Sequence, residues 1–353
     1  MASVLDDIPD TLTGPAAWLG SEMAGRPSRW LYRLQPQEIT DLEQAAAKFL
    51  ATGRDMATMT AEDFPLILFD AHLAYVRSDL MQGPGVVLLR GLPVQRYDRQ
   101  TAAAIFYGIG VHLGRPRPQN AQGHLLGHVR DTGARPDDPE VRIYQTAARQ
   151  SFHTDSADAV GLLCLQAAKS GGRSLVVSAE TIFNQMRFMR PALLERLFDP
   201  IATDRRGEVP PGAAPFVEIP VFSWHDGRLT VFYQRQYIES AQRHAGALRL
   251  SDDHIAALDL FDLLANDPKL HLEMELIPGD MQFVYNHAML HDRTAFLDWP
   301  EPERRRHLLR LWLALPGDRA LPECFAQRYG SVEVGARGGV ALDDVAPVAV
   351  LEG

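Results

Sequence analysis

The segment SFHTD at residues 151–155, followed by the apolar run AVGLLCL at 159–165, decides how this chain is interpreted. Residues two apart in a β-strand face the same side, so His153 and Asp155 would present an imidazole and a carboxylate to one point. These two groups are two thirds of the two-histidine, one-carboxylate set that holds non-haem Fe(II). The apolar run then reads as a buried strand beside a candidate metal site.

A second His-x-acid triplet, His271-Leu272-Glu273, tests how specific this pattern is. The residues from 270 to 276 alternate between apolar and polar, with the leucines and Met274 on the apolar side. His271 and Glu273 would then lie on the opposite, solvated face. We therefore expect no metal site at the second triplet.

The composition describes an ordinary globular chain. It has 353 residues, of which 46% are hydrophobic and 23% charged, and the formal net charge is -10. An acidic chain repels a phosphate backbone, so we expect no nucleic-acid partner. We also expect no membrane span, and no signal peptide at the start MASVLDD. The two cysteines, Cys164 and Cys324, are too few for a disulfide framework and fit a cytoplasmic location.

Helical and strand patterns occur in mixed order along the chain. Apolar spacing of three and four residues predicts helices at 37–51, 99–113, 179–188 and 252–264. Short apolar runs, and a hairpin with Asp226-Gly227 at its turn, predict strands at 85–90, 159–165, 175–177, 222–233, 281–285 and 308–315. No composition shift marks a boundary, so we expect a single α+β domain.

Five features occur in a fixed order between about residues 84 and 315. They are the strand GVVLLRG at 85–91, the His-x-Asp triplet, the turn GGRS at 171–174, a histidine before RTAF at 293–296, and the arginine-rich segment 304–312. Each is weak alone, but the ordered combination is specific. The chain resembles the TauD/TfdA branch of the Fe(II)- and 2-oxoglutarate-dependent oxygenases, in the clavaminate-synthase-like superfamily.

The resemblance implies an architecture. The core would be a double-stranded β-helix, or jelly roll, with helices packed outside it. Residues 1–83 would form an N-terminal helical segment on that core, and 84–328 the oxygenase domain. The irregular stretch 115–140 would be a lid loop, because long loops of this kind are usually functional. The segment 329–353 would be a C-terminal tail.

The resemblance also implies a ligand set for iron. His153 and Asp155 match the first two ligands of the family. His291 matches the third, because DRTAF follows it directly, as in the family. His287 is the rival for this position, and we expect it to be packed or hydrogen-bonded nearby.

The arginine strand supplies candidates for binding 2-oxoglutarate. In a strand, Arg306, Leu308, Arg310 and Trp312 share one face, and inward arginines need anions. A guanidinium matches a carboxylate bidentately. The resemblance makes Arg306 the partner of the distal carboxylate of 2-oxoglutarate, with a hydrogen bond from Ser174. Arg310 would face either the substrate or the other carboxylate of 2-oxoglutarate.

Four residues are candidates for contacting the substrate. Gln145 and Arg149 have the parity of His153 if the strand is regular. Arg149 could equally be half of a structural ion pair. Gln119 and Asn120 lie in the expected lid. The spare arginines favour a small, anionic substrate.

The implied function is hydroxylation or oxidative cleavage of a small organic molecule with Fe(II), 2-oxoglutarate and O2, which releases succinate and CO2. An aspartate at 155 favours hydroxylation over halogenation, because halogenases of the superfamily have Ala or Gly there. A homo-oligomer would fit the family, although no interface is readable in the sequence. Two alternatives stay open: a cupin-type metal-dependent dioxygenase or isomerase without 2-oxoglutarate, and a non-catalytic jelly-roll binding protein.

Overall fold

Two antiparallel sheets form the centre of the molecule. The computed structural model describes residues 3–135, 141–340 and 345–351. The larger sheet has the order β1-β2-β14-β6-β17-β3, and β4 also pairs with β17. Its strands are β1 (Leu31–Arg33), β2 (Val86–Arg90), β14 (Met281–Tyr285), β6 (Ala159–Gln166), β17 (His307–Ala314), β3 (Arg115–Arg117) and β4 (Leu126–Val129). All its pairs are antiparallel except β1 with β2.

The smaller sheet has the order β13-β8-β15-β5. Its strands are β13 (His271–Met274), β8 (Ser174–Ser178), β15 (Met289–Arg293) and β5 (Gln150–His153). Three two-stranded pairs complete the β-structure: β9 (Ile201–Asp204) with β10 (Phe216–Ile219), β11 (Phe222–His225) with β12 (Arg228–Val231), and β7 (Ser170–Gly171) with β16 (Phe296–Leu297).

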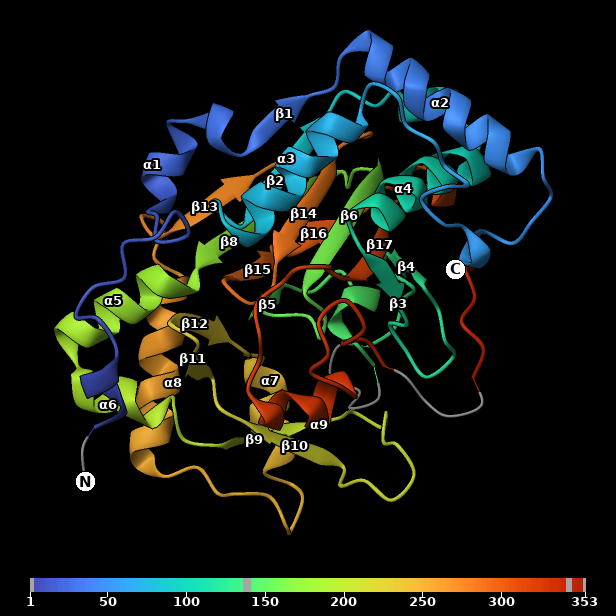
Figure 1. Ribbon diagram of the computed structural model, residues 1–353. Coiled ribbons are helices and arrows are strands. Elements are labelled where there is room, and N and C mark those ends of the chain that lie inside the picture. Colours follow the sequence, from blue (N-terminus) through green and yellow to red (C-terminus); the bar gives the residue numbers. More distant parts are fainter. Residues whose placement is uncertain (1–2, 136–140, 341–344, 352–353) are drawn as a thin grey trace.

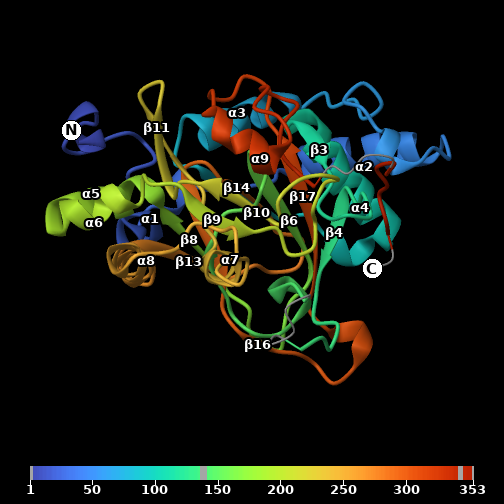
Figure 2. The ribbon, with the colours of Figure 1, turned by 90° about the horizontal axis from the view of Figure 1, so that it is seen from below.

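Helices cover the strands in two groups, which lie on different sides in both views (Figures 1 and 2). One group comprises α2 (Pro36–Leu50), α3 (Asp70–Met81) and α4 (Arg99–Leu113), which share a hydrophobic core with the larger sheet. The other comprises α5 (Ala179–Met189), α6 (Pro191–Arg196) and α8 (Asp252–Ala265), packed with the hairpin and the smaller sheet. The short helices are α1 (Gly20–Ala24), α7 (Arg235–Ala241) and α9 (Ala326–Tyr329). Within the described ranges, no helix has both the length and the hydropathy to cross a membrane.

The helix caps and the hairpin turn that the sequence predicts from neighbouring residues are present in the structure. Side chains of Asp98 and Ser178 accept hydrogen bonds from the first turns of α4 and α5. Asp226 and Gly227 both have positive φ, 48° and 71°, so the predicted β11–β12 hairpin is closed by the turn that this pair favours. The predicted helices and main strands are therefore confirmed within a few residues.

Three segments are more ordered than the sequence indicates. The N-terminal segment, expected to be helical, also adds the parallel strand β1 to the larger sheet. The expected lid at 115–140 contains β3 and β4, which hydrogen-bond to β17; residues 136–140 lie outside the described part. The expected tail is docked in the fold, because Arg337 is fully buried and the amide of Val340 donates to the carbonyl of Pro118. Short-range periodicity carries no signal for such long-range pairing.

Candidate active site

Two strands of the smaller sheet bring the His-x-Asp triplet to His291. β5 and β15 are antiparallel neighbours, and His153 pairs in register with His291. Their ring centroids are 4.1 Å apart. Asp155 follows β5 directly, with one carboxylate oxygen 3.9 Å from Nε2 of His153 and the other 3.7 Å from Nε2 of His291. One ligand atom from each residue therefore lies within 4.8 Å of the others.

The tautomer of His153 is set by its own strand. Nδ1 of His153 lies 2.8 Å from the carbonyl oxygen of Ser151, so it carries the proton and donates. Nε2 is then the free acceptor of the imidazole. The side-chain amide nitrogen of Gln150 lies 2.9 Å from this Nε2. A metal ion that binds here requires the Gln150 side chain to move away.

The carboxylate of Asp155 is buried but remains an anion. Burial raises the pKa of Asp155, but the charge of Arg310, the two neighbouring histidines and the hydrogen bond from Trp312 outweigh burial, so the net pKa is below its usual value. The indole N–H of Trp312 donates to Oδ2 at 2.8 Å. Nη1 of Arg310 lies 3.8 Å from the same oxygen. The carboxylate of the cluster is thus a charged candidate ligand.

The imidazole of His291 is neutral at physiological pH. Burial, followed by the neighbouring His153, lowers the pKa of His291 to about 3. Its Nδ1 is buried and has no hydrogen-bond partner among the described residues. Two imidazoles and one carboxylate are the donor set that suits non-haem iron.

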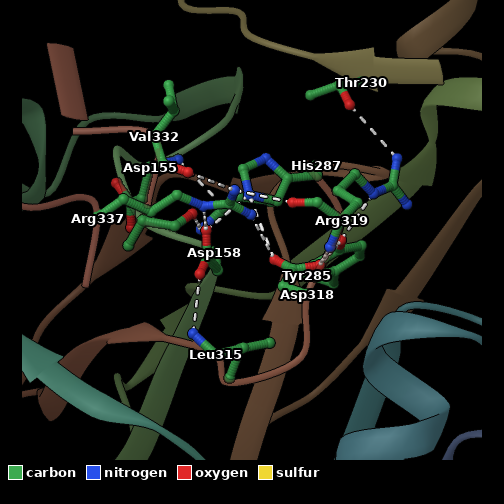
Figure 3. A network of polar contacts seen from close by, with 12 residues as sticks. Asp155, Asp158, Thr230, Tyr285, His287, Leu315, Asp318, Arg319, Val332 and Arg337 are labelled. Atoms are coloured by element: carbon green, nitrogen blue, oxygen red, sulfur yellow. Dashed lines mark hydrogen bonds and ion pairs between the residues drawn. The ribbon is translucent and has the colours of Figure 1, made fainter. Parts of the chain in front are cut away.

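His287 lies in a different environment, shown in Figure 3. Its Nε2 is 2.8 Å from Asp158, and both side chains are fully buried. Arg337 reaches the same carboxylate at 2.7 Å and Asp318 at 3.0 Å. Although Asp158, His287 and Asp318 are close enough together to hold a metal, the guanidinium of Arg337 already occupies the centre of this network. The sequence-based expectation of a hydrogen-bonded His287 agrees with these contacts.

A cavity of about 40 Å³ lies between the two sheets, next to the triplet; we call it the intersheet cavity. It is lined by His153, Ser174, His291, Arg293, Arg306 and Arg310, among others. Arg306, Leu308 and Arg310 all line it, as the strand parity predicts. Burial lowers the pKa of Arg306 to about 10, and its Nη1 has no partner within the described chain. Ser174 donates a hydrogen bond to the side chain of Gln282 at 2.9 Å.

Arg310 is held by a residue of the expected lid. Its Nε donates to Oε1 of Gln119 at 2.6 Å, and Nε2 of Gln119 donates to the main-chain carbonyls of Leu125 and Arg310. Gln119 is 2% exposed and lies behind Arg310, outside the cavity lining. The sequence predicts that Gln119 contacts the substrate. In the structure it supports Arg310 instead.

The other three substrate candidates also lie outside the cavity linings. Arg149 donates to Asp292 at 2.6 Å and is 45% exposed, which matches the structural ion pair considered for it. The Gln145 side chain accepts from the amide of Arg142, and the Asn120 side chain accepts from the amides of a tight turn. The geometry gives no support to a substrate contact by these three residues.

Residues before β5 do not have the side-chain parity expected of a regular strand, for a local reason. Residues 143–145 form a 3-10 helix, β5 begins only at Gln150, and its pairing with β15 shifts register between His291 and Arg293. As a result Gln150, three residues before His153, faces the ligand atoms. Arg293 also lines the intersheet cavity and is not among the site residues predicted from the sequence. It follows His291 by two residues, and the sequence shows it only as part of the RTAF motif.

The comparisons with known proteins agree with this geometry. A family model described as "Taurine catabolism dioxygenase TauD, TfdA family" matches residues 52–312. The chain belongs to this family. The FR-33289 synthase of Streptomyces rubellomurinus (strain ATCC 31215) is 30% identical over 330 residues, which cover 92% of this chain and 97% of the relative. The taurine hydroxylase-like protein SAT17 of Stachybotrys chartarum (strain CBS 109288 / IBT 7711) is 30% identical over 310 residues, 85% of this chain and 79% of that one.

Solved structures share the fold. An asparagine oxygenase in complex with Fe(II), 2S,3S-3-hydroxyasparagine and succinate aligns with a TM-score of 0.60 and 18% identity, over 81% of this chain and 93% of the other. The non-haem iron oxygenase OrfP in complex with Fe and α-ketoglutaric acid aligns with a TM-score of 0.59 and 14% identity, over 80% and 93%. This TauD-family chain is therefore an Fe(II)- and 2-oxoglutarate-dependent dioxygenase that hydroxylates a small molecule, as the sequence motifs predict. The cupin-type and non-catalytic alternatives are set aside.

Proposed function

We propose that His153, Asp155 and His291 hold the Fe(II) of this dioxygenase. The observation that carries the assignment is the convergence of two buried imidazoles and one buried carboxylate within 4.8 Å, on the wall of a cavity. Three ligands on one side leave positions open for other molecules. The residues present therefore fit the metal that the family uses.

We further propose that Arg306 and Ser174 bind the distal carboxylate of 2-oxoglutarate. A buried guanidinium with an unpartnered Nη1 requires an anion, and the intersheet cavity offers no carboxylate within bonding distance of it among the described residues. The hydroxyl of Ser174 can turn from Gln282 to the ligand. Arg293 lines the same cavity; main-chain carbonyls of Thr146 and Ala148 accept hydrogen bonds from its two Nη atoms, and only its Nε lacks a partner among the described residues. Among the described residues, Arg306 is thus a cavity arginine whose Nη1 is available to an anion.

The protein residues supply geometry and exclude water. When bound, Fe(II) with O2 and 2-oxoglutarate supplies an oxidant that transfers one oxygen atom to a substrate C–H bond, while succinate and CO2 are released. Trp312 and Arg310 fix the orientation of the Asp155 carboxylate, and Ser151 fixes the tautomer of His153. The two sheets bury the site, which keeps water from competing with the substrate. Gln150 must release Nε2 of His153 before these groups act together.

The proposal extends to the fold, the substrate class, the location and the oligomeric state of the protein. The two sheets would form a double-stranded β-helix as one domain, and 115–140 would act as its lid. The substrate would be a small anion; a relative from Amycolatopsis, 30% identical over 178 residues, is named a uridine-5'-phosphate dioxygenase. Both cysteines are free thiols, which supports a cytoplasmic location. A homo-oligomer stays a prediction from the family resemblance.

An anaerobic spectrum tests the residue assignments. Fe(II) and then 2-oxoglutarate are added to the protein, and the visible charge-transfer band of a 2-oxo acid chelated to Fe(II) is recorded. We expect the band in the wild type, its loss in Asp155→Ala, and a much higher half-saturating 2-oxoglutarate concentration in Arg306→Ala. Arg304→Ala is a matched control, because Arg304 is half-exposed and lies on Trp299. An unchanged band in Asp155→Ala would contradict the ligand set.

A further inference from the structure

A second cavity, which we call the arginine cavity, lies next to Asp155. Its lining includes Arg142, Ser156, Tyr237, Arg310, Trp312 and Arg328, and its volume is about 30 Å³. Tyr144, Gln150 and Arg310 line both this cavity and the intersheet cavity, so these side chains form the partition between the two. A ligand in the arginine cavity would therefore approach the Asp155 side of the triplet, while Arg306 and Ser174 remain in the other cavity.

Two arginines of this cavity share one carboxylate. Arg142 forms an ion pair with Oε1 of Glu208, and Arg328 lies 3.6 Å from Oε2. The side chains of Arg142, Arg328 and Glu208 are 15%, 10% and 9% exposed. Glu208 is not part of the lining, so it supports the two guanidiniums from behind. Arg142, Arg328 and Glu208 together therefore carry one positive charge in excess.

Other acidic groups in the neighbourhood are already engaged. Asp155 belongs to the candidate metal ligands and faces Arg310. Asp204 is paired with Arg243 at 3.1 Å and accepts from Ser240. Within the described ranges, the arginine cavity is thus lined by three arginines and a single carboxylate, Asp155. A buried excess of guanidinium is unfavourable unless an anion compensates it.

The remaining wall of the cavity can donate or accept hydrogen bonds without adding charge. Nε of Arg328 donates to the hydroxyl of Ser156 at 2.8 Å. Tyr237 and Gln234 also line the cavity. The guanidinium of Arg206 lies over the ring of Tyr237 at 5.1 Å and adds a further positive charge nearby. These groups suit a polar ligand with several oxygens.

The spare arginines named in the sequence, Arg149 and Arg310, each face a carboxylate of their own. Arg149 is paired with Asp292 outside the cavities, and Arg310 is held by Gln119 and Asp155. The unbalanced positive charge of the site is located instead at Arg142 and Arg328. Arg328 comes from α9, at the end of the expected oxygenase domain and just before the expected tail, which Arg337 anchors through Asp158 and Asp318 (Figure 3).

We propose that Arg142 and Arg328 bind an oxyanion group of the substrate in the arginine cavity, and that they determine which substrates are accepted. The guanidiniums form hydrogen-bonded pairs with the carboxylate, phosphate, phosphonate or sulfonate of the substrate. The remainder of the molecule extends past Asp155 toward the metal. This inference rests on the proposed ligand set, since it assigns the opposite cavity to 2-oxoglutarate. The small volume requires Tyr144 and Gln150 to move when the substrate binds.

Calorimetric titration of the anaerobic Fe(II)–2-oxoglutarate complex tests the proposal. The probes are methylphosphonate, methanesulfonate and acetate, and saturating 2-oxoglutarate keeps them from Arg306. We expect at least one probe to bind the wild type, and Arg142→Gln and Arg328→Gln each to weaken it tenfold or more. Arg328→Lys should recover part of the loss, because it restores the charge without the planar fork. Arg304→Gln should bind the probe as the wild type does.

The outcomes separate this proposal from the one it rests on. If the 2-oxoglutarate band forms but no probe binds, or if the Gln variants bind as tightly as the wild type, the arginine assignment is wrong. If the band fails to form in the wild type, the ligand assignment fails first. Arg328→Gln leaves Glu208 with one cation fewer, so its fold is checked by circular dichroism. If Arg328→Gln does not fold, the double variant Arg328→Gln/Glu208→Gln, which removes the charges of both residues, is used in its place.

Discussion

The indole N–H of Trp312 donates a 2.8 Å hydrogen bond to Oδ2 of Asp155, and both groups are buried. The two residues come from different sheets, with Trp312 on β17 and Asp155 beyond the end of β5. The bond fixes one oxygen of a carboxylate that we assign to the metal. Partners of this kind orient a ligand before the metal arrives.

We expect Trp312→Phe to bind Fe(II) about 10- to 100-fold more weakly, the range for loss of a hydrogen bond to a metal ligand. The Phe variant keeps an aromatic ring at this position and removes the N–H donor. Anaerobic Fe(II) titration measures the affinity. Trp299→Phe is the control, because Trp299 lies in the segment before β17, away from the triplet. Equal affinities in wild type and Trp312→Phe would show that the bond does not orient the ligand.

Arg306→Leu should weaken 2-oxoglutarate binding by about 2–3 kcal/mol, roughly 30- to 150-fold, because a charge-assisted pair to the distal carboxylate is lost. The measurement is the 2-oxoglutarate dependence of succinate formation together with the band titration. Fe(II) affinity should change little, since Arg306 is not part of the triplet. Loss of iron binding instead would place Arg306 in the structural support of the metal site.

Arg337→Met should destabilise the fold by about 3–5 kcal/mol, because it leaves Asp158 and Asp318 buried with too little positive charge. Urea unfolding followed by circular dichroism gives the free energy of unfolding. Arg304→Met at the surface should change it by less than about 0.5 kcal/mol. If Arg337→Met is as stable as the wild type, the C-terminal segment contributes little to the fold, despite its buried contacts.

The stability should fall below about pH 6.5, in part because of His307. Burial, followed by the neighbouring His128, lowers the pKa of His307 to about 3, while the unfolded chain titrates near 6.5. Between these two values the unfolded state binds the extra proton, so acidification favours unfolding. His307→Gln removes this group and can still bond to His128. Its stability relative to the wild type should rise by about 1.4 kcal/mol for each pH unit below 6.5. A constant difference from pH 7 to pH 5 would contradict the assignment.

The sequence determined the features that depend on residues close together in the chain. The strand period places Leu308 and Arg310 of β17, with Arg306 just before it, on one side, and the three line one cavity. Capping residues set the starts of α4, α5 and α8, and the order of the motifs is sufficient to identify the family. The His-x-Asp spacing was sufficient to bring His153 and Asp155 together.

The tertiary structure alone decided the partners of these residues. Whether Asp155 meets Trp312, or Arg142 and Arg328 share Glu208, depends on how two sheets and the C-terminal segment pack across long sequence separations. Periodicity also fails where a strand begins late, which is why Gln150 faces the ligand atoms and Gln145 does not. Local propensity fixes which face a residue occupies within an element. Packing free energy summed over the whole fold fixes what that face meets.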